Sequence, residues 1–158
     1  MRRIAATLAV GALLFSAGSA WADFYDGLAA AQRGDYATAL QEWQPLAEQG
    51  NAAAQFNLGI MYATGRGVPE NDAEAVKWYR KAAEQGLAEA QFNLGLMYDE
   101  GTGVPEDYVK AYMWLSLAKA QGQKQAAKGL DLLKTLMTGA DISKAQALAS
   151  EWWEEHND

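Results

Sequence analysis

The chain has 158 residues, of which 50% are hydrophobic and 21% charged, a composition that suits one compact domain with an apolar core. It contains no cysteine, which excludes disulfide bonds, thiolate zinc sites and thiol catalysis. Its formal net charge of −7 disfavours nucleic acids and anionic lipid surfaces as partners.

Residues 1–22 have the features of a secretory signal peptide. Two arginines form a positive start, an apolar run extends from Ile4 to Phe15, and small residues precede a predicted cut between Ala22 and Asp23. The apolar run is too short to span a hydrocarbon layer of roughly 30 Å, so we expect cleavage rather than an uncleaved anchor. We therefore expect a periplasmic or secreted protein with no membrane insertion after cleavage. All 20 acidic residues but only 11 of the 13 basic ones follow residue 22, which leaves a net charge of −9.

The rest of the chain contains a sequence repeat with an offset of 36 residues and no gap. The string AQFNLG at 54–59 returns at 90–95, and GxGVP at 65–69 returns at 101–105. A fixed period of roughly 20 to 50 residues is the signature of a solenoid. The predicted units are a degenerate first repeat at 23–51, repeats at 52–87 and 88–123, and C-terminal capping helices at 124–158.

Each repeat is predicted to form two antiparallel helices, which makes the fold all-α. In the first helix of the 52–87 repeat, Ala54, Leu58 and Met61 recur at the spacing of one helix face. Gly59 and Gly95 recur at a position where a side chain would push the partner helix away. We expect large Trp and Tyr rings to pack against the backbone there.

The helix boundaries have chemical signals. Pro69 disfavours helix at the residue before it. Asn71 is the predicted N-cap of the following helix, with Glu74 as its partner in a capping box, and Gly86 suits the left-handed residue that ends this helix.

Two ion pairs are predicted on the exposed face of the helix that follows Asn71, Glu74 with Lys77 and Arg80 with Glu84.

The string AxAQFNLGxMYxxGxGVP, at residues 52–69 and again at 88–105, resembles the Sel-one-like repeat, a relative of the tetratricopeptide repeat. The resemblance implies an α/α superhelix, here a short right-handed solenoid of antiparallel helix pairs that scaffolds protein complexes. A cysteine-rich secreted branch of the family includes proteins that bind or hydrolyse β-lactams, but this chain lacks the cysteines of that branch.

Residues for catalysis are sparse. The single histidine, His156, lies in a charged tail, where a solvated role is expected. The serines after residue 22 are Ser116, Ser143 and Ser150, and none has the context of a nucleophile elbow. The paired glycines of GxGVP lack the GxxxxGK spacing of a phosphate loop, and the acidic residues 99–107 lack that of a calcium loop. We therefore expect no enzyme, no cofactor and no metal.

The tryptophans divide into two groups. Trp43, Trp78 and Trp114 recur at repeat positions and are expected in the core. Of Trp152 and Trp153, one is expected to seal the last repeat while its neighbour stays partly exposed, where it is a possible anchor for a partner.

Comparison with tetratricopeptide repeats places the first helix of each pair on a concave face. Apolar and polar side chains there suit an extended peptide or helix with apolar anchors and basic flanks. Alternatively, Phe56 and Phe92 fill space between neighbouring repeats. Asn57 and Asn93 then hydrogen-bond adjacent repeats to each other instead of binding a ligand. The candidate binding residues are Phe56, Asn57, Ile60, Thr64, Glu89, Phe92, Asn93, Leu96 and Asp99.

These features predict an exported, non-catalytic protein-interaction module, a scaffold or regulator that binds a peptide or protein in its concave groove. Two alternatives remain, a β-lactam-processing enzyme and a binder of cell-wall glycan that uses exposed Trp and Tyr. A short solenoid with open ends permits either a monomer or weak self-association.

Overall fold

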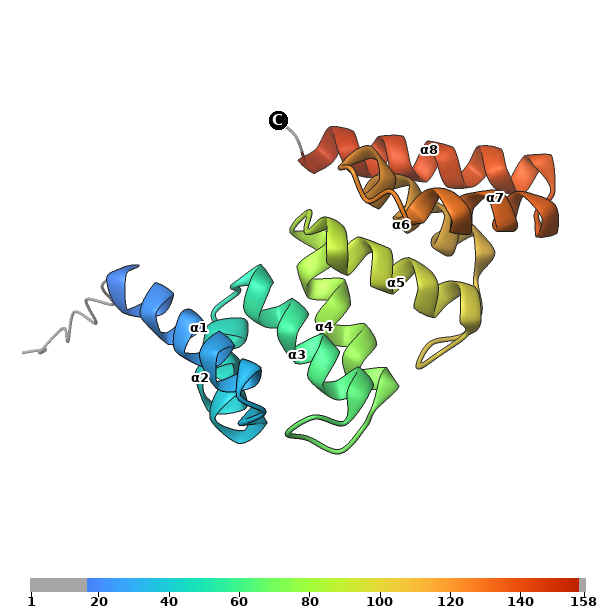
Figure 1. The fold of residues 1–158 in the computed structure, drawn as a ribbon. Helices are drawn as coiled ribbons and strands as arrows, with labels where there is room; N and C mark the ends of the chain where they lie inside the picture. Colours follow the sequence, from blue (N-terminus) through green and yellow to red (C-terminus); the bar gives the residue numbers. More distant parts are fainter. Residues whose placement is uncertain (1–16, 157–158) are drawn as a thin grey trace, which may run out of the picture.

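The computed structural model describes residues 17–156, and this part of the chain consists of α-helices joined by short loops, without strands (Figure 1). The all-α solenoid predicted from the repeat is therefore confirmed. The helices are α1 (Ala17–Gln32), α2 (Tyr36–Glu48), α3 (Ala52–Thr64), α4 (Asp72–Glu84), α5 (Ala88–Glu100), α6 (Tyr108–Ala120), α7 (Ala126–Leu136) and α8 (Gly139–His156).

The predicted signal peptide lies mostly outside the described residues. Its last residues belong to α1, which continues through the predicted cut at Ala22 and Asp23. The signal peptide and its cleavage stay predictions. Within 17–156, the helices all fall short of the length and apolarity that crossing a bilayer requires.

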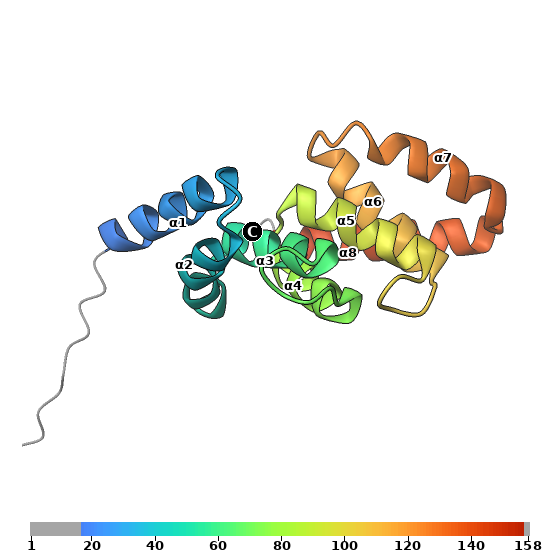
Figure 2. The same ribbon diagram turned by 60° about the horizontal axis from the view of Figure 1, so that its bottom comes forward.

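The helices follow one another as packed pairs along the solenoid (Figures 1 and 2). α1 packs on α2, α3 on α4, and α5 on α6, and the second helix of each pair also packs on the first helix of the next. The C-terminal helices depart from this order, because α7 and α8 both have α6 as their main neighbour. The last helix therefore covers the end of the solenoid instead of extending it.

The predicted helix caps are present, with one correction. The side chain of Asn71 accepts a hydrogen bond from the backbone N–H of Glu74, at 3.1 Å. The prediction of a capping box is wrong. The backbone N–H of Asn71 donates to the carbonyl of Tyr62, and the carboxylate of Glu74 pairs with Lys77 instead. Gly86 has φ +87° and follows the end of α4, as expected.

The two predicted ion pairs on α4 have different outcomes. Glu74 and Lys77 form theirs. Arg80 does not pair with Glu84, because its guanidinium donates to the phenol oxygen of Tyr98 in the next repeat, at 2.8 Å.

The core contains most of the residues that the repeat places inward. Trp43 and Trp114 are buried, as predicted, whereas Trp78 is only partly buried and carries the ammonium of Lys81 over its ring. Trp152 is buried and Trp153 is 40% exposed, so the expected difference between these neighbours is confirmed.

Close packing explains the recurring glycines. A Cβ at Gly59 would lie 2.5 Å from the ring of Tyr79, which is the aromatic neighbour predicted from the sequence. The prediction of an aromatic neighbour is wrong at Gly95. A Cβ there would meet Leu115, at 2.8 Å, because leucine occupies the position that Tyr79 holds one repeat earlier.

Candidate peptide-binding surface

The apolar candidates on α3 and α5 contribute to packing as well as to the surface. Phe56, Ile60, Phe92 and Leu96 are half-buried and contact the larger hydrophobic cluster of the protein. The ring of Phe56 lies 5.7 Å from that of Tyr79, centroid to centroid. Since these side chains fill space between neighbouring helices, only part of each is accessible to a partner.

The two asparagines of the repeat have different surroundings. Asn93 hydrogen-bonds the phenol of Tyr79, whose pKa is raised by burial and lowered in part by this bond. Asn57 has Trp43 at the equivalent position, and the indole N–H of Trp43 donates to the carbonyl of Phe24 instead, at 3.1 Å. The side-chain amide of Asn57 has no hydrogen bond to any described residue, so it is available to a ligand.

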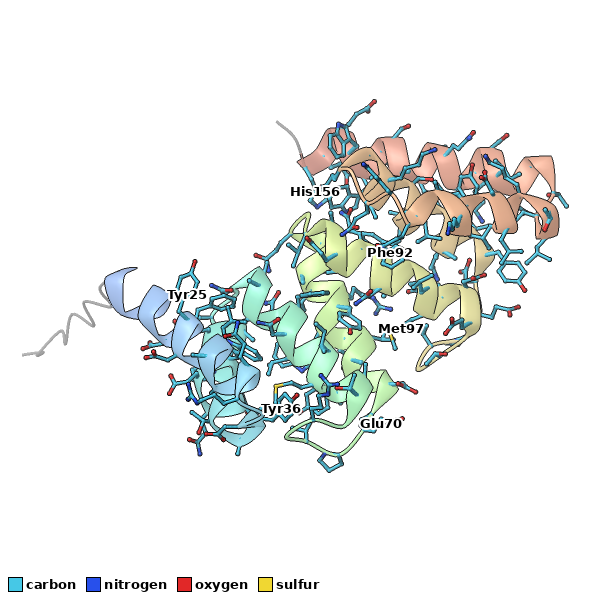
Figure 3. The ribbon with its side chains drawn as sticks, viewed as in Figure 1. Tyr25, Tyr36, Glu70, Phe92, Met97 and His156 are labelled. Carbon is cyan, nitrogen blue, oxygen red and sulfur yellow. The ribbon has the colours of Figure 1, made fainter. Side chains whose placement is uncertain are left out.

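Asn57 opens into a hollow of about 240 Å³ between α1, α2 and α3. Trp43, Ile60 and Met61 supply apolar surface, and Tyr36, the first residue of α2, lies beside the C-terminal end of α3 (Figure 3). A concave, mainly apolar site with a few polar groups is the usual form of a binding pocket. The full lining is Ala31, Gln32, Tyr36, Trp43, Asn57, Ile60, Met61 and Arg66.

Arg66 provides the positive charge of this hollow. Its guanidinium lies over the ring of Tyr36, at 5.5 Å from the centroid, and forms no salt bridge within the part of the chain that the structure describes. The equivalent residue in the next repeat is Thr102. The cation is therefore specific to the hollow beside the first helix pair.

The remaining candidates lie outside the hollow. The hydroxyl of Thr64 donates to the carbonyl of Ile60, at 2.7 Å, and Glu89 is exposed. Burial raises the pKa of Asp99, and the nearby carboxylates of Glu100 and Glu106 add to the rise. The structure therefore brings Asn57 and Ile60 together, and leaves an acidic group at the far end of α5.

Sequence reasoning missed Gln32, Tyr36 and Arg66 as lining residues. Tyr36 is the first residue of α2, in the degenerate first repeat, and Arg66 is the variable residue of the GxGVP string. An available signal was the difference between Arg66 and Thr102, since a charged residue at a variable position of a repeat marks a surface that is not shared by all units.

One further spacing relevant to catalysis was overlooked. Ser116 and Lys119 form an S-x-x-K spacing on α6, which is typical of penicillin-binding serines, and they line a hollow of about 330 Å³ with Lys134 and Ser150. No hydrogen bond joins Ser116 to Lys119 among the residues described, and Lys134 forms an ion pair with Asp131. The hollow contains the residue types of this chemistry without the hydrogen bond that would activate the serine.

The other candidates for chemistry are equally unassembled. His156 is exposed and stacks on Trp152, with ring centroids 4.1 Å apart. In the described part of the chain, no three histidine or acidic side chains are grouped closely enough to hold a metal ion.

Comparisons with known proteins agree with this architecture. The sequence profile of the Sel1 repeat matches residues 52–87 and 88–123. No curated protein sequence matches the chain. Among solved structures, a Sel1 repeat protein from Oxalobacter formigenes is 37% identical with a TM-score of 0.66, over 72% of this chain and 89% of that one.

A second solved structure is a protective antigen present in uropathogenic Escherichia coli strains that displays an SLR fold. It is 31% identical with a TM-score of 0.82, over 88% of this chain. The match covers only 31% of the antigen, so this chain spans about a third of its length. The repeats, the helical solenoid and the identity to the Oxalobacter protein together show that the chain belongs to the Sel1 repeat family.

Proposed function

We propose that this protein is a non-catalytic interaction module that binds an extended peptide segment of a partner protein. Sel1 repeats are typically protein-interaction modules, which supports the general function. The proposed site comprises the hollow between α1, α2 and α3 and, one repeat later, the half-buried Phe92 and Leu96 on α5.

The free amide of Asn57 is the observation that carries this proposal. An extended peptide presents backbone N–H and C=O groups that lose water on binding and need replacement partners. A side-chain amide provides both a donor and an acceptor. At Asn57 these groups border an apolar hollow, so an apolar side chain of the peptide enters the hollow while its backbone bonds the amide.

Charged side chains at the two ends of the site orient the bound segment. At one end, the guanidinium of Arg66 donates to an acceptor on the peptide, such as a backbone carbonyl or a carboxylate. The acidic side chains of Asp99 and Glu106, near the C-terminal end of α5, favour a basic residue at the other end of the segment. The charge of −9 after residue 22 adds a general attraction for basic partners.

We also propose that the protein acts after export, with cleavage before Asp23. Such cleavage retains Phe24, whose carbonyl accepts the hydrogen bond from Trp43, so the contact between α1 and α2 is preserved. N-terminal sequencing of the protein from the periplasmic fraction tests this step. A first residue other than Asp23 contradicts the predicted cut.

Site-specific photo-crosslinking tests the binding site. A photoreactive amino acid replaces Gln32, at the rim of the hollow, and a control protein carries it at Lys77, an exposed residue of α4 that does not line the hollow. Illumination of producing cells is expected to give a discrete adduct only from the position in the hollow. Mass spectrometry of the adduct identifies the partner and the bound segment.

Two substitutions then separate the hollow from the rest of the surface. Asn57→Ala is expected to remove the adduct, whereas Thr102→Ala, at the position equivalent to Arg66 in the next repeat and outside the hollow, is expected to leave it unchanged. Circular dichroism verifies that both variants remain helical. An adduct of equal yield from both variants, or from Lys77 as well as Gln32, rules out the hollow as the peptide site.

A further inference from the structure

A second hollow, of about 250 Å³, lies where the C-terminal ends of α4, α6 and α8 meet. Figure 3 shows His156 at the end of α8, the helix that folds back over α6. The hollow does not contain any residue of the proposed peptide site. Its chemistry is supplied by Glu84, Gln85, Gln121, Trp152, Trp153 and His156.

The two glutamines expose acceptors because their amide nitrogens are used inside the protein. The side-chain nitrogen of Gln85 donates to Oε1 of Gln55, at 2.7 Å, and to the carbonyl of Lys81, at 3.3 Å. That of Gln121 donates to Oε1 of Gln91, at 2.8 Å. The amide oxygens of Gln85 and Gln121 accept no hydrogen bond from the residues the structure describes, so these oxygens remain for a ligand.

The carboxylate of Glu84 is the charged group of the hollow. The two cations within one helical turn of it are engaged elsewhere, because Arg80 donates to Tyr98 and Lys81 lies over Trp78, at 4.3 Å from the ring centroid. Glu84 has no ion pair among the described residues, and no lysine or arginine is found in the described lining of the hollow. A negative charge is thus left beside free acceptors.

His156 provides a further acceptor, and its ring stacks with Trp152 to form an aromatic side of the hollow. Nδ1 of His156 lies 2.7 Å from the carbonyl oxygen of Trp152, and a carbonyl only accepts, so Nδ1 carries the hydrogen. In the neutral imidazole Nε2 is then an acceptor. The imidazole stacks on Trp152 with an interplanar angle of 9°, next to the partly exposed ring of Trp153.

We propose that this hollow binds an arginine side chain of a protein partner. A carboxylate, amide oxygens and aromatic faces are the groups that a guanidinium prefers, because it carries five N–H donors, one positive charge and a planar face that stacks on indole. Lysine has three donors on a compact, strongly hydrated ammonium and lacks the planar face. The site is independent of the peptide hollow, so either proposal stands if the other fails.

The test titrates the protein with an acetylated and amidated Gly-Arg-Gly tripeptide. The readout is the NMR signal of the indole N–H groups of Trp152 and Trp153 in the ¹⁵N-labelled chain. The expected result is a saturable shift with a dissociation constant in the millimolar range. Peptides with citrulline, which has the shape of arginine without its charge, and with lysine in the central position are the matched ligands, and both are expected to bind more weakly.

Two isosteric variants complete the test. Glu84→Gln is expected to weaken binding about threefold, the size of a solvent-exposed charge pair. Glu48→Gln changes the same repeat position on α2, outside the hollow, and is expected to bind like the parent chain. The assignment is overturned by citrulline or lysine binding as tightly as arginine, by unchanged binding in Glu84→Gln, or by the absence of a saturable shift.

Discussion

The side-chain amide of Gln121 donates to Oε1 of Gln91, at 2.8 Å, and 36 residues earlier Gln85 donates to Gln55 in the same way, at 2.7 Å. Gln91 is fully buried, and its own nitrogen donates to the carbonyl of Ala83 in the preceding repeat, at 3.2 Å. Each buried glutamine therefore joins the ends of two consecutive second helices through a first helix. This repeated bond holds neighbouring units in register.

Gln91→Ala is expected to destabilise the protein by about 2 kcal/mol, because it deletes the side-chain hydrogen bonds with the carbonyl of Ala83 and the amide of Gln121 and opens a cavity at a fully buried position. The free energy of unfolding in urea measures the effect. Gln146→Ala, at an exposed glutamine of α8, is expected to change stability by less than about 0.5 kcal/mol. Equal effects of the two substitutions would show that the glutamine hydrogen bonds between repeats contribute nothing to the free energy of unfolding.

Gly59→Ala is expected to destabilise the protein by about 1 to 3 kcal/mol, since the new Cβ would lie 2.5 Å from the ring of Tyr79 and force α3 and α4 apart. Gly139→Ala is the matched control. A Cβ there meets nothing within 4 Å, so removal of backbone freedom is expected to stabilise the chain by about 0.5 kcal/mol. Thermal unfolding followed by circular dichroism distinguishes the two, and a loss of stability in both would contradict the packing argument.

The regular part of the solenoid was predictable because one string encodes one helix pair. The identical AQFNLG and GxGVP strings produce α3 and α5 with the same length and the same left-handed glycine at the end, at φ +64° for Gly65 and +66° for Gly101. The position of α8 was not predictable. Ala145, Ala149 and Trp152 define one apolar face, but this spacing does not say that the face packs on α6 instead of α7.

The candidate site was only partly predictable for a related reason. Asn57 and Asn93 lie in identical strings, and their difference arises from residues 14 positions earlier, Trp43 and Tyr79. The phenol of Tyr79 reaches its asparagine, whereas the indole N–H of Trp43 is taken by a carbonyl of α1. Pattern matching within a repeat does not detect such a contact, because the deciding atom belongs to another helix.

Trp152→Ala is expected to destabilise the protein by about 3 kcal/mol, because the buried indole packs edge-on against Trp114 with 6.0 Å between ring centroids. Trp153→Ala, one residue later, removes a ring that is 40% exposed and is expected to cost less than about 1 kcal/mol. Urea unfolding of both variants measures the difference. A larger loss of stability in Trp153→Ala than in Trp152→Ala would contradict the packing of α8 on α6 through the face that carries Trp152.

Asp99→Asn is expected to stabilise the protein at pH 7. Burial, with the neighbouring carboxylates of Glu100 and Glu106, raises the pKa of Asp99 above its ordinary value of 3.8, so the ionised side chain disfavours the folded state. This penalty falls as pH decreases through the raised pKa and is absent below about 3.8, so the advantage of the asparagine disappears over the same range. Urea unfolding at a series of pH values measures it.

Asp107→Asn provides a comparison of opposite sign. Burial acts to raise the pKa of Asp107, but the backbone N–H and the ammonium of Lys110 outweigh it and lower the pKa below 3.8. The ionised carboxylate thus stabilises the fold above pH 3.8, and this contribution is lost as pH falls through the lowered value. Asp107→Asn is expected to destabilise the protein at pH 7, and the same sign for both variants would show that their carboxylates do not experience these opposite environments.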